Sequence, residues 1–363
     1  MNNALNLTLN LTNECNLRCA YCYQICGDNN HKYIGNERMT ESTGKAAVKL
    51  CLSGTGKAGG ITYYGGEPLL QKQLIFDLTE YGTAEAIKAG KKFAFKMTTN
   101  GILLDNEFIE FVKNFDFEIA VSYDGVLQDK FRCFPDGEGT KSILDAKLPM
   151  ILSAFPDTPA LCTVPKNGAS EFGEAVIEAF NKGFKRVNCV IDYRPDAGWE
   201  DIDLIFVKKG YEKIRDYLMR FPNTDGGNRR IFMPFEDKIF SLIKSDNCAD
   251  RCRLGKKQPS VAPDGIIYPC VQFVGKPEYK IGDVYKGIDA EAAERLYKKS
   301  LEPVISCVGC SIADRCRHHC ACLNYQLTGD MNTVSPLQCE HERILIQTAD
   351  LYGEHLYKSG ILK

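Results

Sequence analysis

Short apolar segments alternate with longer helix-like segments over residues 1–221 of the chain. The apolar segments have the pattern of strands, and they cover residues 5–11, 61–64, 93–98, 117–122, 160–164 and 186–192. Helical spacing marks segments between them, such as 40–52, 69–89 and 171–181, and several end at a glycine such as Gly54, Gly90 or Gly183. Six βα units in series predict an α/β fold with a parallel sheet, open or partly closed into a barrel.

Four consecutive predicted strands are followed by unusual residues. In a parallel sheet of this kind a ligand binds at the C-terminal ends of the strands. The residues there are Cys15, Cys19 and Cys22 after the first strand, Gly65-Gly66-Glu67-Pro68 after the second, Thr99-Asn100-Gly101 after the third and Ser122-Tyr123-Asp124-Gly125 after the fourth. We expect all four groups to meet at one mouth of the sheet.

The βα rhythm fades after Phe221, and nine of the seventeen cysteines lie between Cys248 and Cys339. This change predicts a domain boundary, with a barrel over residues 1–221 and a second, cofactor-braced domain that ends in a helix over residues 222–363. No internal repeat or low-complexity tract is visible beyond the βα periodicity.

The composition bears on the compartment and on partners. Forty-five basic and 47 acidic residues give a net charge of −2. The sequence therefore lacks the excess of basic residues that is typical of proteins that bind nucleic acid or an anionic membrane. No apolar run reaches the roughly 20 residues that span a bilayer, and the N-terminus lacks the pattern of a signal peptide. We therefore expect a cytoplasmic protein whose cysteines are reduced and serve metals or catalysis rather than disulfides.

The motif Cys15-x3-Cys19-x2-Cys22 supplies three thiolates on a loop after a strand. Tetrahedral structural zinc needs four ligands, whereas a four-iron cluster held by three cysteines keeps one iron open for a substrate or cofactor. Cys26 is a possible fourth ligand, so a zinc site or a closed cluster is the alternative.

This motif, with Tyr21 before its last cysteine, resembles the signature of the radical S-adenosylmethionine (SAM) superfamily. The resemblance implies that SAM binds the open iron and is cleaved to methionine and a 5'-deoxyadenosyl radical, which takes a hydrogen atom from the substrate. Gly65-Gly66-Glu67 resembles the superfamily's GGE motif, in which the glutamate contacts the SAM ammonium group. Asn100, Ser122 and Asp124 are candidate contacts for the ribose and methionine parts of SAM. The sequences Gly-Gly-Glu-Pro, Asn-Gly and Asp-Gly at these places are also common in ordinary turns.

The C-terminal cysteines resemble the SPASM domain of peptide- and protein-modifying radical SAM enzymes. Its pattern is matched by Cys252, Gly265 and Cys270, then Cys307-x2-Cys310-x5-Cys316-x3-Cys320, then Cys339. The resemblance implies a partial (β/α)6 TIM-like radical SAM barrel with a small C-terminal iron-sulfur domain. It also implies three 4Fe-4S clusters, of which one auxiliary cluster is held by Cys307, Cys310, Cys316 and Cys339 and the other by Cys270, Cys320, Cys252 and Cys248.

Two questions about the cysteines stay open. Without Cys248 the second auxiliary cluster would have an open iron, and a pair of zinc sites, with His318 and His319 as possible ligands, is the alternative to both clusters. Most cysteines outside the patterns are expected to be buried packing residues. Cys162 and Cys189 are on predicted strands and are candidate hydrogen-atom donors to a product radical.

Relatives with this pattern include anaerobic sulfatase-maturating enzymes and enzymes that crosslink ribosomally made peptides. In the former an aspartate regarded as the general base follows the cysteine of G-x4-C, where this chain has Val271, which cannot take a proton. The prediction is therefore a peptide maturase that forms thioether or carbon-carbon crosslinks, with a peptide or protein substrate and a flavodoxin- or ferredoxin-type reductant. Gln272 and Phe273 are the candidate substrate grip.

Two alternatives to a peptide maturase remain, namely sulfatase-type maturation and, in another class, an iron-sulfur electron carrier or zinc module without SAM chemistry. Because 14 residues precede Cys15, we expect leader recognition to come from elsewhere in the chain or from a separate protein.

Overall fold

A twisted sheet organises the molecule in this computed structural model, which describes residues 5–22, 38–221, 229–243 and 252–362. Six strands of the sheet are β1 (Leu5–Asn10), β2 (Ala58–Tyr64), β3 (Lys92–Thr99), β4 (Phe117–Ser122), β5 (Pro159–Val164) and β6 (Arg186–Ile191). They lie side by side in chain order and are all parallel. The predicted α/β architecture of consecutive βα units is confirmed.

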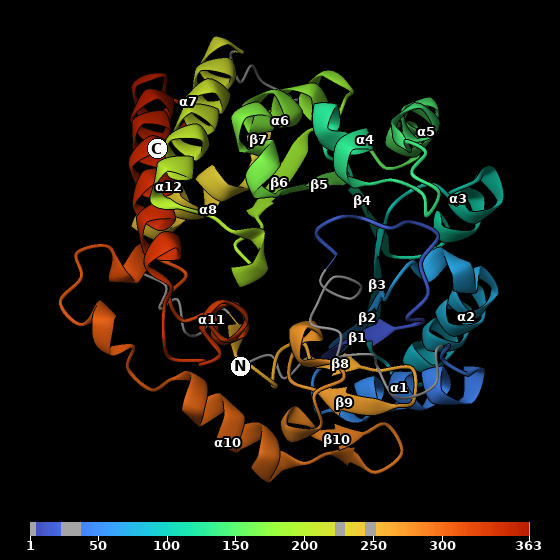
Figure 1. Ribbon diagram of the computed structural model, residues 1–363. Coiled ribbons are helices and arrows are strands. Elements are labelled where there is room, and N and C mark those ends of the chain that lie inside the picture. The colour runs from blue at the N-terminus through green and yellow to red at the C-terminus, as the bar shows by residue number, and fades with distance from the viewer. Residues whose placement is uncertain (1–4, 23–37, 222–228, 244–251, 363) are drawn as a thin grey trace.

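The helices that follow these strands lie on the outer side of the sheet (Figure 1). They are α1 (Glu41–Ser53), α2 (Lys72–Lys88), α3 (Asn106–Val112), α4 (Gln128–Phe131), α5 (Lys141–Ala154), α6 (Phe172–Asn181) and α7 (Leu204–Arg220). Local chemistry fixes their ends: the Thr40 hydroxyl accepts the Thr43 N–H at 3.2 Å and the Asp105 carboxylate accepts the Phe108 N–H at 2.9 Å. Gly90 follows α2 in the left-handed conformation that favours glycine, with φ +63°.

The sheet continues at both edges with strands from the second half of the chain. Short β7 (Ile231–Phe232) pairs with β6, and β8 (Ser260–Val261) pairs with β1, both in parallel. An antiparallel series follows β8, made of β9 (Ile266–Tyr268), β10 (Gly282–Asp283) and β11 (Gly287–Ile288). Strands of two or three residues are too short to leave a period in the sequence, which is why they were not predicted. The predicted boundary at 221/222 stays a prediction. Hydrogen bonds cross it at both edges of the sheet, from β1 to β8 and from β6 to β7.

Helices of the second half are α8 (Met233–Ile243), α10 (Ala290–Ser300), α11 (Ala321–Thr328) and the C-terminal α12 (Pro336–Lys358). Figure 1 shows α12 beside α7 and α8. No helix within the described ranges is both long and apolar enough to cross a bilayer.

A buried ion pair fastens α12 to α8 and to the cysteine-rich segment between α10 and α11. Lys238 on α8 and Glu342 on α12 are 2.5 Å apart, and their side chains are 2% and 5% exposed. The Lys238 ammonium also donates to the Arg315 carbonyl at 2.9 Å, and Glu342 accepts the Arg317 N–H at 3.2 Å. Because both charges are out of water, loss of either partner leaves the other uncompensated.

We expect Lys238→Met to lower the free energy of unfolding by about 3–5 kcal/mol, because the buried Glu342 then loses the cation bonded to it. Urea denaturation followed by circular dichroism measures the loss, and the double variant Lys238→Met/Glu342→Met should recover most of it. Lys358→Met, which removes the exposed pair of Lys358 and Glu354 on the same α12, is the control and should leave stability unchanged. Equal stability of all three variants would contradict a structural role for the buried pair.

Candidate active site

The loop after β1 carries the first three cysteines and is held between two other segments. On one side its backbone pairs with the chain after α4, since the Arg18 N–H donates to the Cys133 carbonyl at 2.8 Å and the Ala20 N–H to the Phe131 carbonyl at 2.9 Å. On the other side it contacts the turn after β2. The loop is therefore framed by backbone hydrogen bonds on both flanks, which fixes where its thiols lie.

Gly65 and Gly66 allow this contact with the turn after β2. The Gly66 N–H donates to the Thr12 carbonyl at 2.8 Å and the Glu67 N–H to the Glu14 carbonyl at 2.9 Å. A Cβ on Gly66 would lie 2.0 Å from the Glu14 carbonyl oxygen, and Gly65 has φ +141°. The sequence predicted that these glycines admit a ligand. In the structure they admit the backbone that leads into the cysteine loop, and their contact with SAM stays a prediction.

Glu67 is buried at the junction of β2 and β3, with 1% of its surface exposed. Its carboxylate accepts hydrogen bonds from the Thr99 hydroxyl at 2.7 Å, the Asn100 N–H at 2.8 Å and the Leu69 N–H at 3.1 Å. Burial raises the pKa of Glu67 to about 7, and these hydrogen bonds oppose the rise. Two carboxylate oxygens offer about four acceptor positions, so one remains for a further donor such as an ammonium group.

Asn100 faces the cysteine loop from the end of β3. Its amide nitrogen donates to the Asn16 side chain at 2.8 Å and lies 3.9 Å from the Cys15 sulfur. Ser122, also predicted to contact SAM, ends β4 and is half-buried. The expected convergence of the strand ends on the cysteine loop is thus observed directly for β2 and β3.

The end of β4 reaches the same loop through a buried ion pair. The Arg132 Nε donates to the Asp124 carboxylate at 2.8 Å, and the Tyr21 hydroxyl also donates to Asp124. The other carboxylate oxygen accepts the Thr163 N–H of β5 at 2.9 Å. Arg132 Nη1 lies 4.0 Å from the Cys19 sulfur. One carboxylate therefore joins β4, β5 and the cysteine loop, and one cation faces a thiol.

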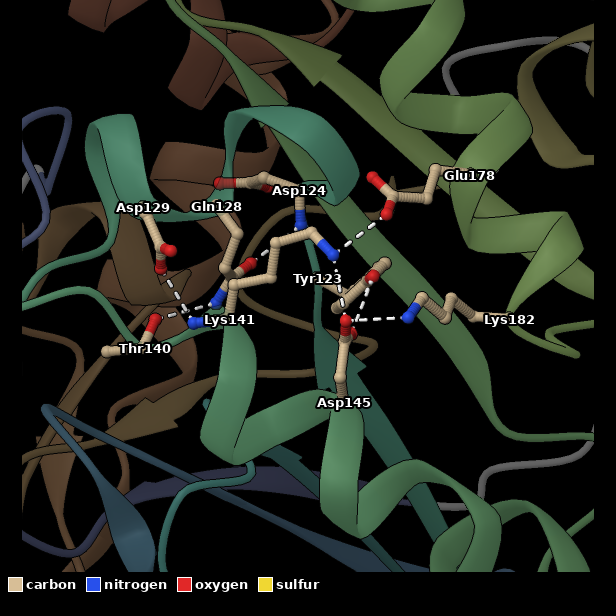
Figure 2. A network of polar contacts seen from close by, with 9 residues as sticks. All are labelled: Tyr123, Asp124, Gln128, Asp129, Thr140, Lys141, Asp145, Glu178 and Lys182. Carbon is tan, nitrogen blue, oxygen red and sulfur yellow. Dashed lines mark hydrogen bonds and ion pairs between the residues drawn. The ribbon is translucent and has the colours of Figure 1, made fainter.

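Polar contacts behind β4 hold Asp124 in place, as Figure 2 shows. The Asp124 N–H donates to the Gln128 side chain at 2.9 Å, and Gln128 donates to the Thr140 hydroxyl at 3.0 Å. The hydroxyl of the neighbouring Tyr123 donates to the carboxylate of Asp145 on α5, at 2.8 Å. Outer helices thus brace the residue that contacts the loop.

Arg132 was missed by the sequence analysis, although a signal was present. Asp124, Gln128 and Arg132 are spaced four residues apart, which puts them on one face of the short helical segment after β4. A cation on the same face as a strand-end aspartate, eight residues further along, indicates an ion pair between the two side chains.

The surroundings of the cysteine loop favour neutral thiols. Burial raises the pKa of Cys15 to about 11 and that of Cys19 to about 12, the latter against the attraction of Arg132. A bound metal centre supplies the positive charge that makes thiolates stable, and metal binding would release protons here.

Cys162 and Cys189 stand opposite one another in the register of β5 and β6, and both are buried. The Cys189 thiol, by its hydrogen bond, and burial both raise the pKa of Cys162 well above its usual value. Their role as hydrogen-atom donors stays a prediction.

The C-terminal cysteines form two neighbourhoods. Burial raises the pKa of Cys307, and nearby Cys339 and Cys310 add to the rise. Burial likewise raises the pKa of Cys316, with smaller contributions from Glu342 and Cys307. Arg343 Nη2 lies 3.9 Å from the Cys310 sulfur. In the other neighbourhood the Cys320 and Cys322 sulfurs are 3.5 Å apart. Cys252 is exposed, and Cys248 and Cys26 lie outside the described residues. Within the described part of the chain, no three His, Cys, Asp or Glu side chains are already grouped as a metal site.

His318 and His319 lie between the two neighbourhoods, with ring centroids 3.6 Å apart. Burial lowers the pKa of His318 to about 4, so this imidazole is neutral at pH 7. Among the described residues the Nδ1 atoms of both rings have no hydrogen-bond partner. A ligand role for either histidine stays an alternative to the thiolate sets.

The two residues predicted to grip a substrate are already engaged. Phe273 has no exposed surface, because it packs against the rings of Tyr279 and Tyr325 at 4.3 and 5.4 Å between centroids. Gln272 accepts a hydrogen bond from Gln326 on α11. Direct contact between Phe273 and a substrate would require this aromatic cluster to open, whereas Gln272 is partly exposed.

A model of the Radical SAM superfamily matches residues 9–139. The chain is 23% identical over 328 residues to a cysteine-type anaerobic sulfatase-maturating enzyme of Clostridium novyi, covering 85% of each protein. An uncharacterized protein of Methanocaldococcus jannaschii is 31% identical over 224 residues, which are 61% of this chain and 68% of that protein.

Two solved structures share the fold. Native anSMEcpe with bound AdoMet and the Cp18Cys peptide aligns over 99% of both chains, with a TM-score of 0.80 and 19% identity. Streptococcus suis SuiB bound to its precursor peptide SuiA aligns over 93% of this chain and 76% of SuiB, with a TM-score of 0.62 and 14% identity. The whole chain, including the part beyond residue 221, therefore has the architecture of radical SAM enzymes with a SPASM domain.

We expect Gly66→Ala to lower the free energy of unfolding by about 1–3 kcal/mol, since its Cβ would meet the Glu14 carbonyl and push the turn from the cysteine loop. Denaturation monitored by circular dichroism and the iron bound after anaerobic reconstitution check this. Gly353→Ala on α12 is the control, because its Cβ would lie 3.2 Å from its nearest neighbour, the Ile239 side chain, and we expect its stability to change by less than about 1 kcal/mol. Normal stability and iron content of Gly66→Ala would contradict the close fit.

Proposed function

The chain belongs to the radical SAM superfamily, and on that premise we propose that it is an enzyme that cleaves SAM reductively and uses the 5'-deoxyadenosyl radical to modify a peptide. Cys15, Cys19 and Cys22 would hold the 4Fe-4S cluster that supplies the electron. The observation that carries the proposal is the contact of the turns after β2, β3 and β4 with the loop of these cysteines. Three thiols are one fewer than a closed site needs, which leaves an iron open for SAM.

The charged groups around the loop suit the amino-acid end of SAM. Glu67 has acceptor capacity left for an ammonium group, and Asn100 offers an amide beside Cys15. Arg132 uses its Nε on Asp124 and its Nη1 faces the Cys19 sulfur, and the other N–H groups of its guanidinium are suited to a carboxylate. The bond from Tyr21 to Asp124 and the pairing of Asp124 with β5 would keep these groups in position during turnover.

We further propose two auxiliary 4Fe-4S clusters, so that the loaded enzyme carries three. The donor set fits, because cysteine thiolates are the ligands of such clusters. Cys307, Cys310, Cys316 and Cys339 would bind one, and Cys270, Cys320, Cys252 and Cys248 are the set that the sequence pattern gives for the other. The reductant would be a flavodoxin or ferredoxin-type protein, and the cytoplasm the compartment, where thiols stay reduced.

A peptide substrate is supported by the peptide-bound state of two proteins of the same fold. Gln272 follows Cys270 and exposes part of an amide that can bond an extended backbone. Val271 at the position of the sulfatase-maturase base favours a thioether or carbon-carbon crosslink over cysteine oxidation. Sulfatase-type maturation is the second candidate, favoured by the similarity to the Clostridium novyi enzyme over 85% of its length.

Replacement of Cys15, Cys19 and Cys22 together by alanine should abolish the formation of 5'-deoxyadenosine from SAM under dithionite, while iron bound elsewhere remains. Liquid chromatography of the nucleoside products and iron analysis measure the two effects. Cys51→Ala, a buried cysteine of α1 away from the loop, is the control and should keep full activity. Undiminished 5'-deoxyadenosine from the triple variant would overturn the assignment, and none from the wild type would favour an electron carrier or zinc module.

The reaction can be tested with a synthetic peptide that carries a sulfatase-type cysteine motif. We expect the enzyme to produce 5'-deoxyadenosine but no formylglycine from this peptide, because Val271 offers no base. Mass spectrometry of the peptide detects the aldehyde, and Val271→Asp tests whether a carboxylate at this place is sufficient to introduce the activity. Formylglycine formed by the wild type would make sulfatase-type maturation the better assignment.

A further inference from the structure

An exposed apolar surface lies where the end of α8 meets the last turns of α12, two helices that are side by side (Figure 1). Leu242 and Ile243 on α8 are 63% and 55% exposed, and Tyr357 on α12 is 69% exposed. Phe240, one helical turn before Ile243, is exposed as well. We call these four residues the α8–α12 surface. Single exposed apolar residues are normal on a protein, whereas a group of large ones on neighbouring helices indicates an interaction site.

This surface contains a hollow beside a projecting ring. A cavity of about 390 Å³ lies between the two helices, with Ile239, Leu242, Ile243 and Leu362 in its wall. Tyr357 lines the same cavity, yet most of its own surface faces solvent. The wall is mostly apolar, so the cavity is suited to an aromatic or aliphatic side chain from outside.

The residues of α8 also indicate that its outer face is covered by a partner. On the inner face Phe235 and Ile239 are buried, and the Phe235 ring lies 5.9 Å from that of Tyr352 on α12. The outer face carries Phe240 and Ile243 instead of the polar residues that are usual on a solvent-facing side. A helix that is apolar on both faces is typical of one that is buried on both.

We propose that the α8–α12 surface binds a second copy of this chain, in a two-fold symmetric dimer in which Tyr357 of each copy enters the cavity of the other. A surface that carries a hollow and a projecting ring side by side can be complementary to itself, as such an isologous interface requires. The inference goes beyond the proposed function and does not depend on its chemistry.

The charges around the surface favour a second copy over a strongly charged partner. Glu354 is paired with Lys358 at 2.6 Å. Asp350 is paired with Arg315 at 2.5 Å. Each acid has its own base, so this rim has no excess of either sign and two copies can approach without repulsion. A strongly acidic or basic protein or peptide would find no complementary field at these pairs.

The size of the surface fits a reversible dimer. Each of its four side chains has roughly 150–200 Å² of surface and exposes about half of it, which gives about 400 Å² of apolar area per copy. Because apolar atoms make up about 57% of an interface, this area corresponds to about 700 Å² per copy once the polar rim is included. A standard interface buries about 800 Å² per partner. We therefore expect monomer and dimer to exchange at micromolar concentrations.

Sedimentation velocity of the full, anaerobically reconstituted chain over a series of micromolar concentrations tests the proposal. The wild type should shift from monomer to dimer as the concentration rises. Leu242→Glu and Tyr357→Glu should each raise the dissociation constant at least about tenfold, because both copies then place a charge in the apolar contact. Ile87→Glu on α2, where the replaced side chain is 74% exposed, is the matched control and should dimerise like the wild type.

Two further measurements locate the contact and check the variants. Circular dichroism and urea denaturation of dilute protein should be the same for all four proteins, since each substitution is at an exposed position. Amide hydrogen exchange of the wild type should be slower in α8 and in the last turns of α12 at high than at low concentration, with no difference in α2.

A wild-type chain that stays monomeric throughout the concentration series would overturn the inference. A dimer that neither Leu242→Glu nor Tyr357→Glu weakens would overturn it too, because the contact would then lie elsewhere on the molecule. If exchange in α8 and α12 slows only when the synthetic sulfatase-type peptide is added, the surface belongs to a peptide and the dimer is again excluded.

Discussion

The buried ion pair of Asp124 and Arg132 is the contact on which the site depends. Both charges have lost their water, at a cost of several kcal/mol for each, so the pair is tolerable only with good geometry and further hydrogen bonds. Those are present: Asp124 accepts from Arg132, Tyr21 and the backbone of β5. The same bonds join the loop of the first cysteines to the ends of two strands. The hydrogen bonds that compensate the buried charge of Asp124 are therefore the same ones that hold the cysteine loop in position.

Much of the fold could be predicted because the signals were local. Six strands of six to eight residues, each followed by an amphipathic helix, leave a period in the sequence, and all six were found. The strands β7 to β11 have two or three residues, and their place depends on partners far along the chain, such as β8 on β1. Pairing over some 250 residues leaves no local pattern, so the extension of the sheet at both edges could only come from the structure.

The site was predictable to the extent that its chemistry lies in motifs. The three-cysteine loop and Glu67 come to one place, as the order of strands required. What the motifs could not give was the use of each group: Gly66 admits a backbone, Asp124 is paired with Arg132, and Phe273 is in a core. The contacts of Gly66 and Phe273 are with residues distant in sequence, and the pairing of Arg132 depends on its spacing of eight residues from Asp124 along one helical face. A motif search shows neither kind of relation.

The register of the sheet also sets the level and direction in which the chain leaves it toward two proposed metal ligands, Cys270 and Cys15. Tyr268, at the end of β9, is paired with Ser260, which is paired with Thr8 of β1. The end of β9 is therefore level with a point about 7 Å before the end of β1. Because β9 runs against β1, the chain leaves the sheet toward Cys270 on one side and toward Cys15 on the other. Cys15 and Cys270 therefore follow strands of opposite direction, and the loops that carry them decide how near the two cysteines come to each other.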